Sequence, residues 1–409
     1  MSLKTYNKNL RRMFKVNILR ILAISAIVAI GISIVTGVSA IPLQIRDALV
    51  SADLESSQLF EINALADKIE LIAYILPTFF ILVSALTVIT TITRLVEEER
   101  QTFACYKTLG YSNFTIILRY VVFAITCTSI GCAVGLLFGN FLLKPAIYGA
   151  ITSRYDLPEI SGIYLTQGLI WSAIMMIAII LTSIFIAFKR CLEKPAELLR
   201  PKAPKAGKKF FLEKIPLIWN HLKFKYKSSS RNIWRFKGRL IITILLVAGS
   251  TIMLFVGLGL FSAINNTEGV QNVEAFTGSM NVIAIVFVLS AISLCVLILF
   301  NLTNINIEER RREIATLKVL GYNQIETAGF IFRELFILAI IGIILGLPLG
   351  YYLTGWLFDY INFGSLDLVK WYVWILTCAI SMMSVFIADV LLYRKINKIE
   401  MHTSLKTVE

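Results

Sequence analysis

Long runs of apolar residues alternate with short charged segments along the chain. Each run could cross the hydrocarbon core of a bilayer, which takes about 20 helical residues. We expect eight membrane-spanning helices, centred on Leu19–Ala40, Leu71–Thr93, Ile116–Leu143, Leu169–Ala187, Leu240–Phe261, Val282–Leu302, Ile331–Leu353 and Trp371–Leu392. The pattern therefore predicts an all-α integral membrane protein, and a hydrophobic content of 57% excludes an ordinary soluble domain.

The charges predict an orientation for these helices. Placing both termini and alternate connections inside gives the inner segments a net charge of +21 and the outer segments −7, which together make the +14 of the chain. Because Lys and Arg accumulate on the cytoplasmic side, we expect both termini in the cytoplasm. The outer connections would then be short loops, at Pro42 to Glu70, Lys144 to Gln167, Asn265 to Ser279 and Phe358 to Lys370.

One segment, Lys189 to Arg239, carries much of the positive charge, with 16 basic and 3 acidic residues. A basic segment beside a membrane helix is typical of contact with anionic membrane lipid. Nucleic-acid binding is the weaker interpretation, since the segment has no aromatic platform for stacking bases.

The chain repeats itself at an offset of 211 residues. Glu97 to Tyr111 read EEERQTFACYKTLGY, and Glu308 to Tyr322 read EERRREIATLKVLGY. Four spans in each copy give both copies the same orientation, unlike the inverted repeats of many carriers. We expect two parallel four-helix repeats, as a first module at 1–200, a cytoplasmic basic linker at 201–226 and a second module at 227–409.

The repeated segment predicts a short amphipathic helix in each copy, because apolar residues recur every three positions, at Phe103, Tyr106 and Leu109 and again at Ile314, Leu317 and Leu320. A glycine directly after the last apolar residue is the expected C-terminal cap. Such a helix, acidic at its start and basic near its end, could contact a cytoplasmic partner or simply lie in the membrane interface. The candidate docking residues are Glu97, Glu98, Arg100, Phe103, Lys107, Leu109, Gly110 and Tyr111, with Glu308, Glu309, Arg311, Ile314, Lys318, Leu320, Gly321 and Tyr322.

Two glycine ladders occupy matched positions in the third and seventh spans. Spacing of four residues places the glycines on one helix face, where another helix can approach closely. The sequence predicts a packing seam at Gly131, Gly135, Gly139, Gly342, Gly346 and Gly350.

These motifs resemble the FtsX-like permease module of ABC transporters, the superfamily that includes the MacB and lipoprotein-releasing permeases. In that family the segment after the second span resembles E-R-x-x-x-[IF]-x-x-x-[KR]-x-[LI]-G-[YF], and it serves as the coupling helix that docks on the ATPase. The resemblance covers the whole chain as two modules, and its closest counterparts are large double-module permeases of Gram-positive bacteria. The chain lacks their long extracellular insertions.

The resemblance implies a permease in a bacterial plasma membrane. Its partners would be a cytoplasmic ABC ATPase homodimer, membrane lipid and an extracellular protein. The ATPase would hold ATP and Mg. This chain would carry no cofactor and would bind two ATPase subunits per copy. Force transmission would serve export or extraction of a lipid, lipoprotein or peptide, or regulation of an extracellular partner.

Other functions have less support in the sequence. No GxxxxGK[ST] phosphate loop occurs, so ATP hydrolysis would need another polypeptide. An ion-coupled carrier is the alternative, suggested by Asp389, Asn301 and Asn304 within or near the spans. An integral membrane enzyme ranks last, because the only histidines, His221 and His402, have no second metal ligand or catalytic partner at useful spacing.

Overall fold

The computed structural model describes residues 11–51, 56–152, 164–194, 196, 237–266, 274–361 and 365–397. Within these ranges the regular structure is helical and no strand occurs. Eight helices are long and apolar enough to span a membrane, which confirms the predicted fold class. The basic linker at 201–226 lies outside the described residues, so the division of the chain at that point stays a prediction.

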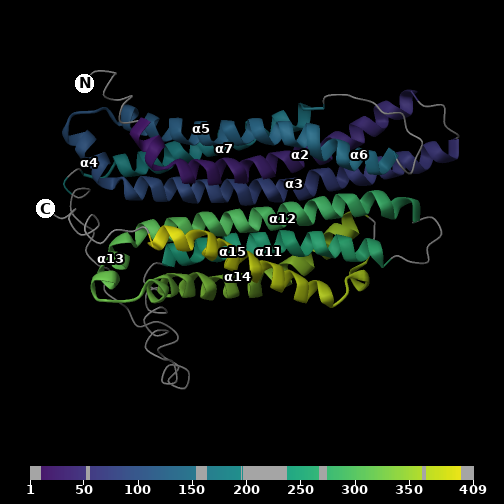
Figure 1. The fold of residues 1–409 in the computed structure, drawn as a ribbon. Helices are drawn as coiled ribbons and strands as arrows, with labels where there is room; N and C mark the ends of the chain where they lie inside the picture. Colours follow the sequence, from purple (N-terminus) through teal and green to yellow (C-terminus); the bar gives the residue numbers. More distant parts are fainter. Residues whose placement is uncertain are drawn as a thin grey trace.

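The helices form two sets of four spans, which we call the first and second modules. The first contains α2 (Ile18–Ser51), α3 (Ser56–Glu98), α4 (Arg100–Thr108), α5 (Asn113–Phe138), the π-helix η1 (Gly139–Leu143), α6 (Lys144–Thr152) and α7 (Thr166–Cys191). The second contains α11 (Lys237–Asn265), α12 (Glu274–Glu309), α13 (Arg311–Val319), α14 (Gln324–Ile361), the short 3₁₀-helix η3 (Leu366–Leu368) and α15 (Tyr372–Asn397). Figure 1 shows the modules side by side with α4 and α13 at the same end. We call α4 and α13 the elbow helices and this end the elbow end.

The helices are longer than the bilayer requires on the side away from the elbows. α3 has 43 residues, about 64 Å at 1.5 Å per residue, against a hydrocarbon core of about 30 Å. The expected outer loop from Pro42 to Glu70 is therefore wrong, since α2 and α3 run through most of it. Ile45 and Ile69 are fully buried in one apolar core there, so burial of apolar surface favours continued helix over loop. The other three expected loops are also partly helical, at α6, the start of α12 and the end of α14.

Each glycine ladder lies where the third span of a module packs on the first. A Cβ atom on Gly135 would lie 2.7 Å from the carbonyl oxygen of Ala29 on α2, and one on Gly346 would lie 2.8 Å from Cβ of Thr251 on α11. The same close approach occurs along both ladders, at Gly131, Gly139, Gly342 and Gly350. Side chains at these positions would push the helices apart, so the glycines permit the seam.

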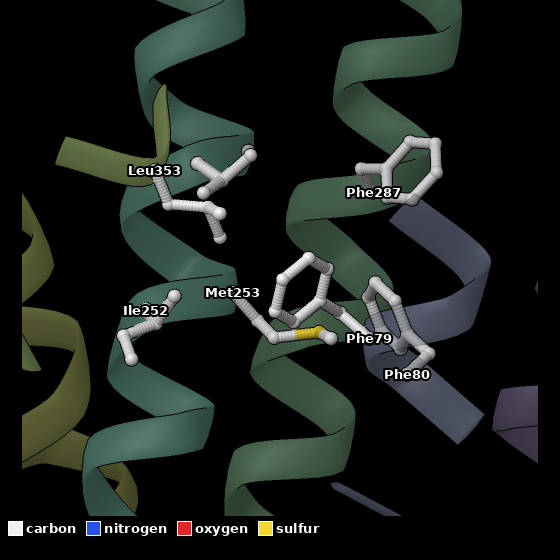
Figure 2. A pocket seen from close by; sticks show the side chains of 8 residues that line it. Phe79, Phe80, Ile252, Met253, Phe287 and Leu353 are labelled. Atoms are coloured by element: carbon white, nitrogen blue, oxygen red, sulfur yellow. The ribbon is translucent and has the colours of Figure 1, made fainter. Parts of the chain in front are cut away.

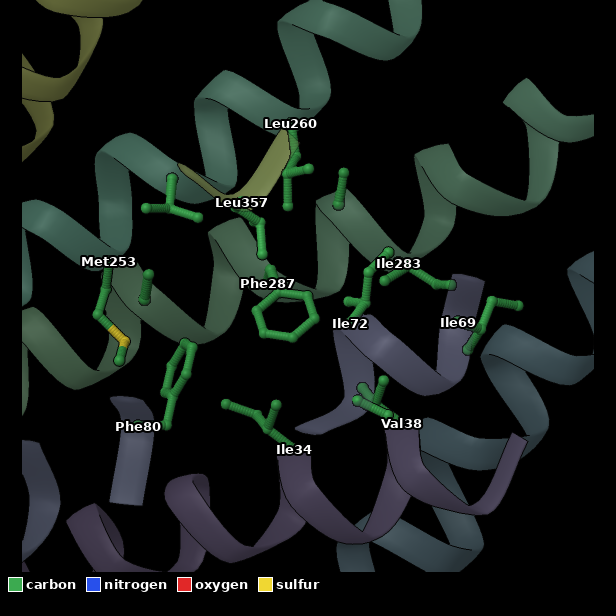
Figure 3. Packing of buried hydrophobic residues seen from close by; sticks show 14 of the residues in the cluster. Ile34, Val38, Ile69, Ile72, Phe80, Met253, Leu260, Ile283, Phe287 and Leu357 are labelled. Carbon is green, nitrogen blue, oxygen red and sulfur yellow. The ribbon is translucent and has the colours of Figure 1, made fainter. Parts of the chain in front are cut away.

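The modules meet through α2 and α3 of the first and α11 and α12 of the second. Figure 3 shows apolar side chains from these helices interleaved in one core. The rings of Phe80 on α3 and Phe287 on α12 lie 5.7 Å apart. Figure 2 shows an apolar pocket at this junction, lined by Phe79, Phe80, Ile252, Met253, Val256, Gly257, Phe287 and Leu353. No charged side chain lines it, so the centre of the junction is hydrophobic.

Candidate functional site: the paired elbow helices

Each elbow helix is nine residues long and follows the second span of its module after one intervening residue. Both helices end at a glycine with positive φ, +81° at Gly110 and +85° at Gly321. The amide of Tyr111 donates to the carbonyl of Tyr106, and that of Gly110 to Lys107, which is the Schellman pattern. The equivalent bonds close the second elbow. This confirms the predicted glycine caps, because residues with a Cβ rarely adopt this backbone conformation.

The acidic residues of the repeat lie at the ends of the second spans. Glu97 and Glu98 belong to α3, and Glu308 and Glu309 belong to α12. The expectation of elbow helices that begin with this acidic pair is therefore wrong. The reason is that α3 and α12 continue as regular helices through the pair, and the chain changes direction only at the next residue.

The first acidic residue of each pair binds the end of the fourth span in its own module. Oε1 of Glu97 lies 2.7 Å from Nη2 of Arg190 on α7. Oε1 of Glu308 lies 2.6 Å from Nζ of Lys395 on α15. Second and fourth spans are thus joined by an ion pair at the same place in both modules.

The second acidic residue of each pair has a different partner in each module. Glu98 receives two hydrogen bonds, at 2.7 and 2.9 Å, from Arg20 on the first span. Burying the Glu98 carboxylate costs desolvation energy. The two hydrogen bonds from the Arg20 guanidinium offset this cost. Glu309 instead pairs with Arg94 of the first module at 2.9 Å. The two copies of the repeat are therefore not equivalent at the elbow end.

The repeated lysines point to the ends of the fourth spans. Nζ of Lys107 donates to the carbonyls of Cys191 and Glu193, the latter at 3.0 Å. Nζ of Lys318 donates to the carbonyl of Ile396 at 2.9 Å. The last carbonyls of a helix have no partner within it, so each ammonium group caps α7 or α15. Burial lowers the pKa of Lys318. The structure gives both lysines an intramolecular role that the sequence did not indicate.

The two arginines of the motif differ in surroundings. Arg100 lies half-buried with Nη2 at 4.0 Å from Oε2 of Glu193, whereas Arg311 is exposed at the start of α13. The first elbow is therefore held more closely to the end of its fourth span than the second.

The apolar stripe predicted for each elbow turns around the helix. Phe103 and Ile314 are buried, whereas Leu109 and Leu320 are 71% and 70% exposed. Residues three apart on an α-helix are separated by about 300°, so a series of three drifts by about 120° and leaves the core. Each elbow thus has a buried apolar root and an exposed apolar tip.

A second exposed apolar residue accompanies each tip. Phe114 and Ile325, which are 211 residues apart, are 73% and 69% exposed in the first turns of α5 and α14. Sequence comparison of the copies misses them, because one is aromatic and the other aliphatic. Tyr322 is also exposed, whereas Tyr111 is half-buried with its ring 5.1 Å from that of Tyr106.

Two of the three residues that suggested an ion-coupled carrier form hydrogen bonds with neighbouring helices. Asn301 donates to Thr91 Oγ1 at 2.7 Å across the module boundary, and Asn304 accepts from Lys395. Asp389 lies half-buried on α15. His221 and His402 lie outside the described residues. The described part of the chain holds no group of three residues suited to a metal ion.

Eight apolar spans, repeated as two modules with an elbow helix at the same end of each, define a multi-pass membrane protein. The family model described as FtsX-like permease C-terminal matches residues 74–196 and 285–401, more than half of the chain. The chain therefore belongs to the FtsX-like permease family, whose members are transport subunits in membranes and permeases of ABC transporters. The searches of curated proteins and of solved structures returned no match.

Proposed function

We propose that this chain is the permease subunit of an ABC transporter whose two elbows dock on a separate cytoplasmic ATPase homodimer. The partner would hold ATP and Mg, since this sequence has no phosphate loop. The observation that carries the proposal is the pair of exposed tips, Leu109 with Phe114 and Leu320 with Ile325, at one end of the molecule. Two matched apolar tips fit a partner that presents two matched grooves, as a symmetric dimer does.

The elbow end would face the cytoplasm of a bacterial cell, with both termini on that side. The excess of Lys and Arg in the segments at this end supports the orientation. Because one chain carries both elbows, we propose one permease for two ATPase subunits.

Force transmission through the helices suits this chain better than passage through a hydrophilic pore. The core between the modules is apolar, and the lysine of each elbow donates hydrogen bonds to the end of a fourth span. Suitable outcomes of such a movement are extraction or export of a lipid, lipoprotein or peptide, or the switching of an extracellular partner protein.

Co-purification in mild detergent tests the docking. We expect an ATPase with a phosphate loop to accompany the parent chain at two copies per permease, measured by native mass spectrometry. The double variant Leu109→Asp with Leu320→Asp should lose it, because a charge in an apolar contact is costly. The control Asn265→Asp with Ser365→Asp adds the same charge at exposed positions of the other end and should retain it. Equal retention by both variants would contradict docking at the tips.

The ion-coupled carrier remains the competing function. It predicts activity that depends on a proton or sodium gradient and persists in the Leu109→Asp, Leu320→Asp variant. Failure of any ATPase to accompany the parent would favour it.

A further inference from the structure

A single residue links the second span to the elbow helix in each module, and its charge is reversed between the modules. The link is Glu99 between α3 and α4, and Arg310 between α12 and α13. These residues are 211 positions apart, so they occupy the same place in the repeat. Their backbone angles, φ −83° and ψ 18° at Glu99 and φ −106° and ψ 13° at Arg310, lie outside the helical region. The chain therefore changes direction at the link residue, where the second span ends and the elbow helix begins.

Both link side chains form ion pairs with the third span of their own module. Oε2 of Glu99 lies 3.1 Å from Nη2 of Arg119 on α5. Nη2 of Arg310 pairs with Oε2 of Glu334 on α14, where the two side chains are only 5% and 6% exposed. In both modules, therefore, the third span carries a residue of opposite charge to the link residue. A reversal of this kind preserves the attraction between the two groups and not the identity of either residue.

Arg119 also connects the elbow helix and the segment before the first span to this ion pair. Its Nη1 donates to the hydroxyl of Tyr106 on α4 at 2.9 Å, and its Nε approaches Sδ of Met13 at 3.2 Å. Its guanidinium carbon lies 5.4 Å from the centre of the Tyr106 ring, within range of a cation–π interaction. The hydroxyl of Tyr120 donates to Glu99 at 2.8 Å. Several directed contacts therefore join α5 to α4 and to the link residue before it, so a rotation of α4 would act on α5.

The third span of each module packs directly on the first span along the glycine seam. Gly131 and Gly135 of α5 lie directly against the backbone of α2, with no side chain between to absorb a displacement. Gly342 and Gly346 place α14 against α11 in the same way. Elbow, third span and first span are thus in mechanical contact in both modules.

We propose that Glu99 with Arg119, and Arg310 with Glu334, are positioning residues that transmit movement of each elbow helix to the third span of its module. This inference rests on the proposed function, because the elbows would be moved by the ATPase. Without the ion pairs, each elbow would remain attached to the second span by the chain and to the fourth by its lysine. It would be joined to the third span only by the four-residue connections at 109–112 and 320–323, so the third span would follow it less closely.

The test follows the third span in the complete complex with the co-purified ATPase, in nanodiscs. In a Cys105→Ser background, one spin label is placed on Gly149→Cys and one on Tyr360→Cys, at the exposed far ends of the third spans of the two modules. The distance between them is measured with and without ATP and vanadate. We expect a shift in the parent and a smaller shift in Glu99→Gln and in Arg119→Gln, because the third span of the first module then follows its elbow less closely. The shift should recover in Glu99→Arg with Arg119→Glu. That double variant reproduces the polarity found in the second module.

Controls separate this inference from the proposed function. Arg46→Gln breaks an exposed pair with Asp67 at the other end and should leave the shift unchanged. Tyr120→Phe removes only a hydroxyl, so it tests the same contact if a charge variant fails to fold, and it should reduce the shift. Single variants that bind and hydrolyse ATP but show a reduced shift support the inference. A normal shift in the single variants, or failure of the reversed pair to restore the shift, overturns this inference while the proposed function stands. Absence of an ATPase from the parent overturns both the inference and the proposed function.

Discussion

Arg94 at the end of α3 and Glu309 at the end of α12 form an ion pair of 2.9 Å that joins the two modules at the elbow end. The side chains are 18% and 20% exposed, so the pair is only partly screened by solvent. The position equivalent to Arg94 in the second module is Ile305, so symmetry does not supply a second pair. The ion pair of Arg94 with Glu309 therefore has no equivalent formed by the residue at position 305.

Removal of this inter-module pair should weaken the association of the modules. We expect Arg94→Gln to lower the free energy of unfolding in detergent by about 1.5–3 kcal/mol, the usual contribution of a hydrogen bond to a charged group. A double-mutant cycle with Glu309→Gln should give a coupling energy well above the error of the thermal measurement. Additive effects of the two changes would show that the pair contributes nothing.

The glycine seam should not tolerate even one added methyl group. Gly135→Ala places Cβ 2.7 Å from the carbonyl of Ala29, so we expect a loss of about 1–3 kcal/mol from overpacking. Gly149→Ala is the matched control, since nothing lies within 4 Å of the new atom. There the same change should be neutral or stabilise the helix by about 0.5–1 kcal/mol. Thermal unfolding of both variants checks the contrast, and equal stabilities would mean that the helices can separate at no cost.

The lysine of the first elbow should protect the end of the fourth span. Lys107→Met removes the donor to the carbonyls of Cys191 and Glu193. Amide hydrogen exchange at the end of α7 should then accelerate at least about tenfold, because a charged donor contributes about 1.5–3 kcal/mol. Lys189→Met removes the same charge from an exposed position on α7 itself and should have a much smaller effect. Similar exchange in both variants would assign the protection to charge alone.

A native cysteine can report the orientation of the elbow end. Cys105 on α4 is exposed, whereas the other five cysteines are buried or half-buried. A membrane-impermeant maleimide should therefore label the protein in inside-out vesicles and leave it unlabelled in intact cells. Cys105→Ser should abolish labelling in the inside-out vesicles. Labelling of the parent in intact cells would place the elbows outside and remove the proposed docking on a cytoplasmic ATPase.

Much of this architecture can be predicted from local features of the chain. Hydropathy alone locates eight spans, because every backbone polar group in a bilayer must be satisfied within a helix. Gly110 and Gly321 could be predicted as helix ends because the preference of glycine for positive φ depends only on neighbouring residues. The offset of 211 residues reveals the modules, since duplicated residues that remain identical are visible without a structure.

Other features depend on which residues meet in space. A comparison of the copies misses the ion pairs of Glu99 with Arg119 and of Arg310 with Glu334. The link residues carry opposite charges, and the third-span partners Arg119 and Glu334 align with Phe330 and Phe123. The lysine caps join residues 78 or more positions apart, so no local pattern reveals them.

The amino-acid sequence by itself determined the class of this protein, its two modules and the position of the elbows, because hydrophobicity, repetition and glycine conformation are properties of local segments. Only the tertiary structure decided which elbow side chains serve the fold and which remain exposed. Phe103 and Leu109 belong to one apolar stripe, yet one is buried and the other lies at the tip. Burial depends on the neighbours that distant segments supply, and those neighbours are chosen when the helices pack.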